Sequence, residues 1–244
     1  MQSLFIGTAG WSLPKQHAAE FSSIGTHLER YAKTFNCAEI NSSFYRPHRP
    51  STWARWSSSV PPNFRFSVKV PRAITHESGL VCPNEYLRAF LEQIAALGDR
   101  LGPLLIQLPP KQTFEESIAQ RFLESLRAEF PLGAVVLEPR HPSWFSPEVD
   151  SMLQRLHISR VAADPAIVEG GGVPGGDLSL AYFRLHGSPR IYYSNYDDAS
   201  LKRIASAIGV LPSPSVYCIF DNTALGHATG NALEIARRTR LTAR

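Results

Sequence analysis

Eight strand-length apolar runs, each closed by a polar residue, constrain the fold of this chain more than any other feature. Most of them are separated by segments of helical length, as in a repeated strand–helix unit. In a closed parallel barrel all strands end on one face, where the catalytic groups of that fold lie. The pattern therefore predicts an α/β fold, a TIM-like (β/α)8 barrel with a polar ring on one face. The polar residues at the run ends are Thr8, Asn41, Lys69, Gln107, Glu138, Asp164, His186 and Asp221.

The length and the remaining composition agree with one barrel domain over residues 1–244, because barrels of this kind reach about 250 residues. No stretch approaches the roughly 20 apolar residues that span a bilayer, and the N-terminus resembles a first strand rather than a leader. The three cysteines are widely spaced and form neither a disulfide framework nor a metal-binding pair. We therefore expect a cytoplasmic protein without a membrane partner.

One connection departs from the strand–helix rhythm. Residues 165–177, between the sixth and seventh runs, contain GGG and GG, which do not support a packed helix. We expect an irregular, flexible or extended connection there. It is either a lid over the site or a shortened crossover without a functional role.

Alternation along the strands places charged residues on shared faces, since residues two apart point the same way. Tyr182, Arg184 and His186 share one face of the seventh run in this way. A buried charge without a partner is costly, so charged groups from several strands should neutralise one another. Their convergence on one rim favours a ligand site over a purely structural network. The side chains expected to pair in the barrel mouth are Glu39, Lys69, Glu138, Asp164 and Arg184.

Nine short motifs run in order from the first strand to the last helix. They are GTAGW at 7–11, NSSFY at 41–45, FSVKVPR at 66–72, ITH at 74–76, LGPLLIQLPP at 101–110, EPRHPSW at 138–144, YFRLHG at 182–187, FDNTALG at 220–226 and NA at 231–232. Together they resemble the YecE-like family, also known as domain of unknown function seventy-two. The resemblance implies a TIM-barrel-like fold and supports the position of the site, but it does not supply a reaction.

The first functional hypothesis is an acid–base enzyme, a lyase, isomerase or hydrolase, that acts on a small anionic substrate, phosphorylated substrates included. Glu138 and Asp164 would serve as general base and acid if their surroundings separate their pKa values. His186 adds an imidazole, which titrates near neutrality. Lys69 is the fourth predicted catalytic group and supplies a positive charge for the anion.

Other polar and aromatic residues of these motifs would bind the substrate. Arginine holds a carboxylate or phosphate through two parallel hydrogen bonds, and aromatic rings often line ligand pockets. The same rings serve equally well as rim packing. The predicted substrate-binding residues are Trp11, Asn41, Tyr45, Arg72, His76, Gln107, Arg140, Trp144, Arg184, Asp221 and Asn222.

A metal-dependent reaction is an open alternative. Oxygen and imidazole ligands on four successive strands could hold a divalent ion, as in a phosphodiesterase or nuclease. Because no HExxH-type spacing is present and nearby cations compete for the carboxylates, a metal is not favoured and the cofactor stays unknown. The net charge of +4 gives a nucleic-acid partner little support. The four candidate ligands are Glu138, Asp164, His186 and Asp221.

A second open alternative is a non-catalytic barrel that binds a metabolite or nucleic acid, because one fold hosts many functions. Arginines that saturate both Glu138 and Asp164, with no open volume beside them, would favour this alternative. The oligomeric state is not indicated by the sequence.

Overall fold

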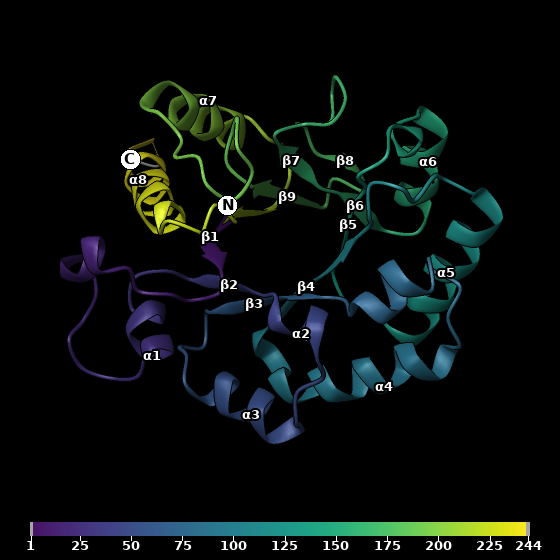
Figure 1. Cartoon of the computed structure of the whole chain (residues 1–244), viewed down its shortest axis with the longest axis horizontal. Coiled ribbons are helices and arrows are strands. Elements are labelled where there is room, and N and C mark those ends of the chain that lie inside the picture. Colours follow the sequence, from purple (N-terminus) through teal and green to yellow (C-terminus); the bar gives the residue numbers. More distant parts are fainter. Residues whose placement is uncertain (1, 243–244) are drawn as a thin grey trace.

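Parallel strands wind into a barrel whose outer side is covered by helices (Figure 1). This computed structural model describes residues 2–242, with side chains up to Thr239. Its strands are β1 (Ser3–Ala9), β2 (Cys37–Ile40), β3 (Arg65–Lys69), β4 (Leu101–Gln107), β5 (Val135–Glu138), β6 (Ile158–Arg160), β7 (Ala162–Asp164), β8 (Gly175–Gly176), β9 (Leu180–Leu185) and β10 (Ser215–Phe220). They pair in the order β7-β9-β10-β1-β2-β3-β4-β5-β6-β8, and only the β6–β8 pair is antiparallel. The predicted TIM-like barrel is confirmed.

The sixth strand of the barrel is split into two segments by Val161. Its first segment, β6, pairs with β5, and its second, β7, pairs with β9. Val161 itself donates to Leu137 O over 2.8 Å, and His186 N donates to Asp164 O over 2.7 Å. The two segments close the ring, so the strands still occupy eight positions around it.

Seven of the eight predicted strand ends lie at an observed strand end, and Thr8 is the penultimate residue of β1. The last residues of β3, β4, β5 and β7, and the residues directly after β2, β9 and β10, are the polar residues selected from the sequence. Because parallel strands point the same way, these ends meet on one face of the barrel. The sequence pattern therefore located this face correctly.

Helices cover the outside of the barrel. They are η1 (Lys15–Glu20), α1 (His27–Ala32), α2 (Ser42–Tyr45), α3 (Pro50–Ser58), η2 (Ala73–Glu77), α4 (Asn84–Ile94), η3 (Ala95–Arg100), α5 (Glu116–Glu129), η4 (Pro142–Trp144), α6 (Pro147–Arg155), α7 (Asp198–Gly209) and α8 (His227–Thr242). Local sequence sets their starts: Thr26 and Glu29 form a capping box at α1, and Ser146 caps α6 ahead of Pro147.

Two apolar cores lie on opposite faces of the strands. The larger one fills the space between strands and helices, and a smaller one lies inside the barrel. Alternate residues of one strand supply both cores, as Tyr182 and Phe183 do on β9. The polar groups of the functional face also point into the barrel. Along each strand their side chains alternate in step with those of the smaller core.

The connection at residues 165–177 has no helix, as its glycine content predicted. It includes β8, whose close approach to β6 requires glycine at Gly176 and leaves little room for a side chain at Gly175. A Cβ on Gly175 would lie 2.3 Å from Arg160 Nη2, and one on Gly176 would lie 2.6 Å from Ile158 O. Gly176 also has a φ of +62°, which larger residues rarely adopt. The glycines therefore let this segment pack directly against β6.

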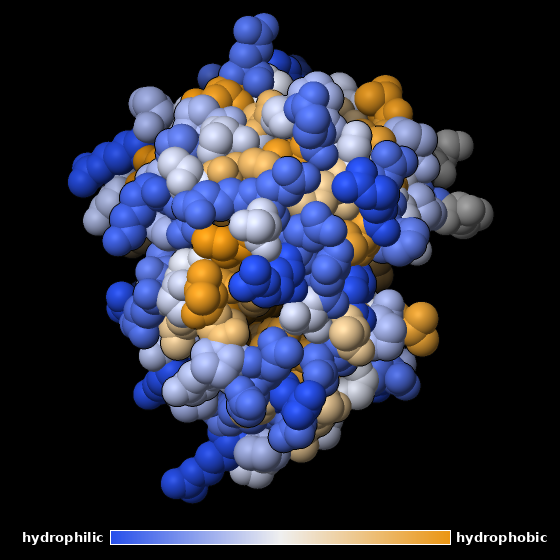
Figure 2. Space-filling model, turned by 90° about the vertical axis from the view of Figure 1, so that its right-hand side faces the viewer, coloured by the Kyte–Doolittle hydropathy of each residue, from blue (hydrophilic) through white to orange (hydrophobic). Residues whose placement is uncertain are grey.

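No helix between residues 2 and 242 combines the length and the apolar character that a membrane span requires. Figure 2 shows the face on the α5 and α6 side, where hydrophilic residues predominate and hydrophobic ones are scattered in small groups. Scattered apolar residues of this kind are ordinary on protein surfaces.

Candidate functional site

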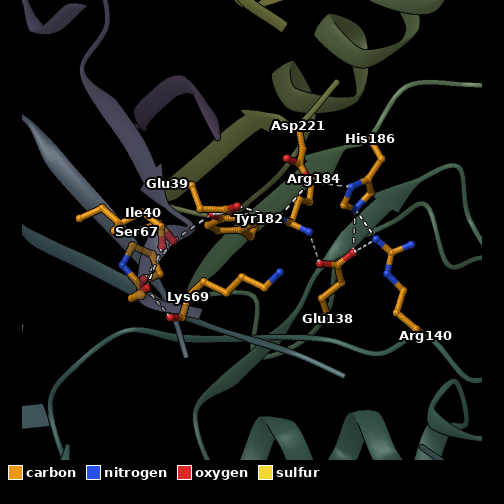
Figure 3. A network of polar contacts seen from close by, with 12 residues as sticks. Glu39, Ile40, Ser67, Lys69, Glu138, Arg140, Tyr182, Arg184, His186 and Asp221 are labelled. Atoms are coloured by element: carbon orange, nitrogen blue, oxygen red, sulfur yellow. Dashed lines mark hydrogen bonds and ion pairs between the residues drawn. The ribbon is translucent and has the colours of Figure 1, made fainter. Parts of the chain in front are cut away.

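Arg184 is the centre of a buried polar network at the C-terminal end of the barrel (Figure 3). The side chain is 1% exposed. Its Nη2 donates to Glu39 Oε1 over 2.8 Å and its Nη1 to Glu138 Oε2 over 3.0 Å, while Asp221 Oδ2 lies 3.0 Å from Nη2. One guanidinium thus forms ion pairs with three carboxylates that come from different strands, and Arg140 supplies a second cation at Glu138. We call the connected set the Arg184 network: Glu39, Glu138, Arg140, Tyr182, Arg184, His186 and Asp221.

Glu138 is fully buried and has both oxygens engaged by cations or imidazole. Oε1 lies 2.6 Å from Arg140 Nη2 and 2.8 Å from His186 Nε2, and Oε2 accepts from Arg184. Burial alone would raise the pKa of Glu138, but Arg184, Arg140 and His186 outweigh it and hold that pKa well below its usual range. Glu138 is therefore a permanent carboxylate at neutral pH.

His186 lies between two carboxylates. Its Nε2 faces Glu138 Oε1 and its Nδ1 lies 3.0 Å from Asp221 Oδ2. Burial would raise the pKa of Asp221, but Arg184 and then His186 overcome it and lower that pKa. An imidazole held at both nitrogens has a fixed ring orientation, which positions it as proton donor and acceptor groups require.

The floor of the network is formed by Tyr182. Its hydroxyl lies 2.8 Å from Glu39 Oε2 and 2.9 Å from Ser67 Oγ. Ser67 in turn donates to Pro103 O over 3.0 Å, so the contacts continue across β3 to β4. These buried contacts fix Glu39 against Arg184 from below, since a fully satisfied polar network is rigid.

Lys69 differs from the other charged groups because its amine is unpaired. Among residues 2–239, no hydrogen bond or ion pair reaches Nζ, which instead lies 4.1 Å from the centroid of the Phe44 ring. The residue is 8% exposed. Burial, followed by the positive charge of Arg184, lowers the pKa of Lys69 to about 8, against the opposing effect of the network carboxylates. A fraction of this amine is therefore neutral near physiological pH.

Three polar atoms at the rim are buried without a hydrogen-bond partner: Asn41 Oδ1, Arg140 Nε and Asn222 Oδ1. A cavity of about 430 Å³ lies beside the network and is lined in part by Trp11, Asn41 and Asp221. Buried polar atoms almost always find a partner, so each exception requires an explanation. A polar ligand at this rim would provide one.

Asp164 does not join the network, and the expectation that it would pair there is wrong. Its Oδ1 accepts from the Tyr196 hydroxyl over 2.7 Å. Along this strand Asp164 points to the same side as Ala162, which packs in the outer core. The inward-facing position next to Ala162 is Val161. Asp221 supplies the third carboxylate instead.

Two further predicted binding residues lie away from the network. Tyr45 is 71% exposed, and Arg72 forms a half-exposed ion pair with Glu77 at 3.0 Å. Both line a separate groove of about 330 Å³ between α2, η2 and α4. They turn outward because each lies beyond its strand, on a helical segment whose direction the strand pattern does not set.

Trp144 is a core residue in the structure. It is 1% exposed, its ring lies 5.0 Å from that of Phe114, and its Nε1 donates to Gln112 O over 3.0 Å. Trp11 is the predicted aromatic residue that reaches the cavity beside the network, where its ring is supported by Trp56 at 5.2 Å.

His76 and Gln107 lie near the network without joining it. The His76 ring packs at 4.8 Å on Phe44, the residue that also contacts Lys69. Burial, then the charges of Lys69 and Arg72, lower the pKa of His76. Gln107 is in register with Glu138 on the adjacent strand. Both are therefore close enough to the rim to face a ligand bound there.

The sequence-based selection of site residues missed Phe44, Tyr182 and Tyr192. The sequence does contain a signal for Tyr182, because its side chain points to the same face of β9 as that of Arg184. Tyr192 lies in the loop after β9 with its ring 5.9 Å from that of His186, and its pKa is raised by burial and by Asp221. No strand-end pattern marks a loop residue of this kind.

The described residues do not form a ready cluster of metal ligands. Among the described residues, no group of three or more His, Cys, Asp or Glu side chains is arranged to hold a metal ion. Of the carboxylates proposed as ligands, Glu138 and Asp221 face arginine and His186, whereas Asp164 accepts from Tyr196. The donor set of this structure therefore fits an ion-pair network.

Sequence comparison finds relatives along the whole chain. A family model described as "Protein of unknown function DUF72" matches residues 5–244. The UPF0759 protein YecE of Escherichia coli K12 is 35% identical over 66% of this chain and 59% of its own length. The UPF0759 protein YunF of Bacillus subtilis is 26% identical over 95% of this chain and 93% of its own. The chain thus spans less than two thirds of the YecE sequence that it matches.

Solved structures show the same fold. A DUF72 family protein from Enterococcus faecalis V583 has a TM-score of 0.82 at 22% identity, covering 97% of this chain and 95% of its own. One from Thermotoga maritima has a TM-score of 0.79 at 24% identity, covering 98% and 100%. D-Psicose 3-epimerase from Clostridium cellulolyticum, with D-tagatose, has a TM-score of 0.56 at 10% identity and covers 99% of each chain. At these identities the similarity concerns the fold alone.

Proposed function

This chain belongs to the DUF72 family, and we propose that it is an enzyme acting on a small anionic substrate by acid–base chemistry at the C-terminal rim of the barrel. Phosphorylated compounds fall within this class. The observation that carries the proposal is the unpartnered buried Nε of Arg140, a donor that an anion can satisfy. The unpartnered Oδ1 atoms of Asn41, which lines the cavity, and of Asn222 would accept from donor groups such as hydroxyls. Leaving such an atom unsatisfied costs roughly 1–3 kcal/mol, which a ligand can recover.

Arg140 is the proposed anion-binding group. Its Nη2 is held by Glu138, whereas its buried Nε lacks a partner. An oxygen of a carboxylate or phosphate would accept a charge-assisted hydrogen bond from this Nε. Arg184 is less suited, because its guanidinium already serves three carboxylates. Glu138 would therefore act by holding Arg140 in position.

Lys69 is the proposed proton carrier. An acid–base catalyst works best when its pKa lies near the operating pH, and the pKa of Lys69 is about 8. Glu138, the base suggested by the sequence, has a pKa far too low for this role. His186 retains a place in the proposal as a neighbouring imidazole fixed by Glu138 and Asp221.

A non-catalytic binding barrel is the second candidate, and the saturation of Glu138 favours it. Both of its oxygens are engaged, as expected for a structural ion-pair network. In contrast, Asp164 is held by a tyrosine hydroxyl rather than arginine, and a cavity lies beside Glu39 and Asp221. Binding of an anion without turnover in any lyase, isomerase or hydrolase assay would select this candidate.

Replacing Arg140 with methionine should weaken the binding of inorganic phosphate and of glycolate about tenfold or more. A hydrogen bond to a charged group contributes roughly 1.5–3 kcal/mol, and methionine supplies none. Isothermal titration calorimetry at pH 7 measures both affinities. The control is Arg55→Met, which removes an exposed arginine of α3 and should leave both unchanged. Equal affinity in the Arg140 variant, or no binding of either anion by the original chain, would contradict the anion site.

A further inference from the structure

We propose that Lys69 is a nucleophile that forms an imine with a small aldehyde or ketone carrying an anionic group. This inference rests on the proposed function, narrows its substrate to carbonyl compounds and gives Lys69 a covalent role in place of the proton-carrying one. The side chain extends from the end of β3 toward Arg184 and Glu138, into the centre of the functional face (Figure 3). Its position, surroundings and lack of partners carry the inference.

The surroundings of Lys69 are those of a reactive lysine. A buried amine normally forms an ion pair, yet no carboxylate within residues 2–239 lies within ion-pair distance of Nζ. The Phe44 ring at 4.1 Å supplies an apolar contact on one side. Desolvation beside a second cation, here Arg184, is an arrangement that activates a lysine for attack on carbonyl carbon.

The charged groups around the amine, together with its burial, set the pKa of Lys69. Burial and Arg184 lower the pKa of Lys69 to about 8, and the carboxylates of Glu39, Glu138 and Asp221 act in the opposite direction. His76, from η2, faces the same amine across Phe44. Because the pKa is lowered, the neutral, nucleophilic form increases with pH and reaches half of the population near pH 8.

The chemical step is balanced without a further reagent. The lone pair of neutral Nζ attacks the carbonyl carbon, a carbon–nitrogen bond forms, and the carbonyl oxygen becomes a hydroxyl group. This hydroxyl then leaves as water, and an imine remains. Both hydrogens of the released water come from the amine. The imine withdraws electrons from the adjacent carbon, which assists the proton transfers of a lyase or isomerase. The unpartnered Nε of Arg140 would bind the anionic group.

Reductive trapping tests this inference. The intact chain is treated with glyoxylate and sodium cyanoborohydride, and carboxymethylated lysines are located by peptide mass spectrometry. Lys69 should be labelled at pH 7 at least about tenfold faster than Lys202, whose exposed amine forms an ion pair with Asp198 over 2.8 Å. Because the pKa of Lys69 is about 8, its labelling rate should rise about tenfold between pH 7 and pH 9, instead of the roughly 100-fold rise of a lysine with the reference pKa of ~10.4.

Lys202→Gln is the matched control and should leave the labelling of Lys69 unchanged. Equal labelling rates at both lysines, or a roughly 100-fold rise of the Lys69 rate between pH 7 and pH 9, would overturn the imine. Glycolate, which has no carbonyl group outside its carboxylate, separates the two proposals. Calorimetric binding of glycolate that depends on Arg140, without selective labelling of Lys69, would overturn the imine and keep the anion site. Absence of glycolate binding and of selective Lys69 labelling would overturn both the anion site and the imine.

Discussion

Replacing Arg184 with methionine should lower the free energy of unfolding by about 3–5 kcal/mol, the usual cost of removing one partner from a buried ion pair. The guanidinium is shared by Glu39, Glu138 and Asp221, so its loss leaves three buried carboxylates without their common cation. Methionine retains much of the volume of the arginine stem, which limits any cavity contribution. Urea denaturation at pH 7 measures the change.

The pH dependence of this effect distinguishes charge from packing. In the original chain the pKa values of Glu138 and Asp221 are lowered by folding, so their contribution to stability is present above the unfolded values of about 4.3 and 3.9. It is lost as the pH falls through the lower, folded values. Without Arg184 the buried carboxylates are stabilised less by ionisation. The difference in free energy of unfolding between the original chain and the Arg184→Met variant should therefore narrow below about pH 4.

Arg88→Met is the control for this experiment. Arg88 forms an ion pair with Glu129 on the surface, with 55% of the arginine side chain exposed. Exposed pairs contribute about 0–1 kcal/mol because water and salt screen them. A loss of comparable size in both variants, or a constant difference at all pH values, would show that the Arg184 network does not act through buried charge.

Replacing Trp144 with alanine should also lower the free energy of unfolding by about 3–5 kcal/mol, as expected for a buried tryptophan. The indole is 1% exposed, packs on Phe114 and donates to Gln112 O, so its removal creates a cavity and an unpaired carbonyl. Urea denaturation measures the loss. Tyr86→Ala, at a ring that is 64% exposed, should change stability by less than about 0.5 kcal/mol.

This variant also tests whether Trp144 contributes to the ligand site. At temperatures where the Trp144 variant remains folded, its affinity for phosphate should equal that of the original chain, because the ring does not line the cavity beside the network. An affinity loss as large as that of Arg140→Met would instead place Trp144 in the binding site. Unchanged stability would contradict its role in the core.

Much of the architecture could be predicted because two local rules hold over most of the chain. An apolar run followed by a polar residue marked the ends of most strands, including those at Lys69 and Glu138. Alternation on β9 correctly placed Tyr182, Arg184 and His186 together, since this strand has polar side chains on one face and Phe183 and Leu185 on the other. The polar face of the barrel follows from these two rules.

The position of Asp164 shows where alternation fails. Val161, Ala162 and Ala163 are all apolar, so the sequence of this run does not show which parity faces inward. A difference of one residue moves a side chain to the opposite face of a strand. Only the pairing of β6 with β5 and β7 with β9 fixes the parity, and it turns Asp164 outward to Tyr196.

The sequence by itself determined the barrel, the face that carries the polar groups and most members of the Arg184 network, because strand periodicity is a local property of the chain. The tertiary structure decided which charges are satisfied. Arg184 lies among three carboxylates, whereas Lys69, one of the residues selected from the same pattern, lies against Phe44 with its amine unpaired. That difference arises from distances between side chains on separate strands, and closure of the barrel sets those distances.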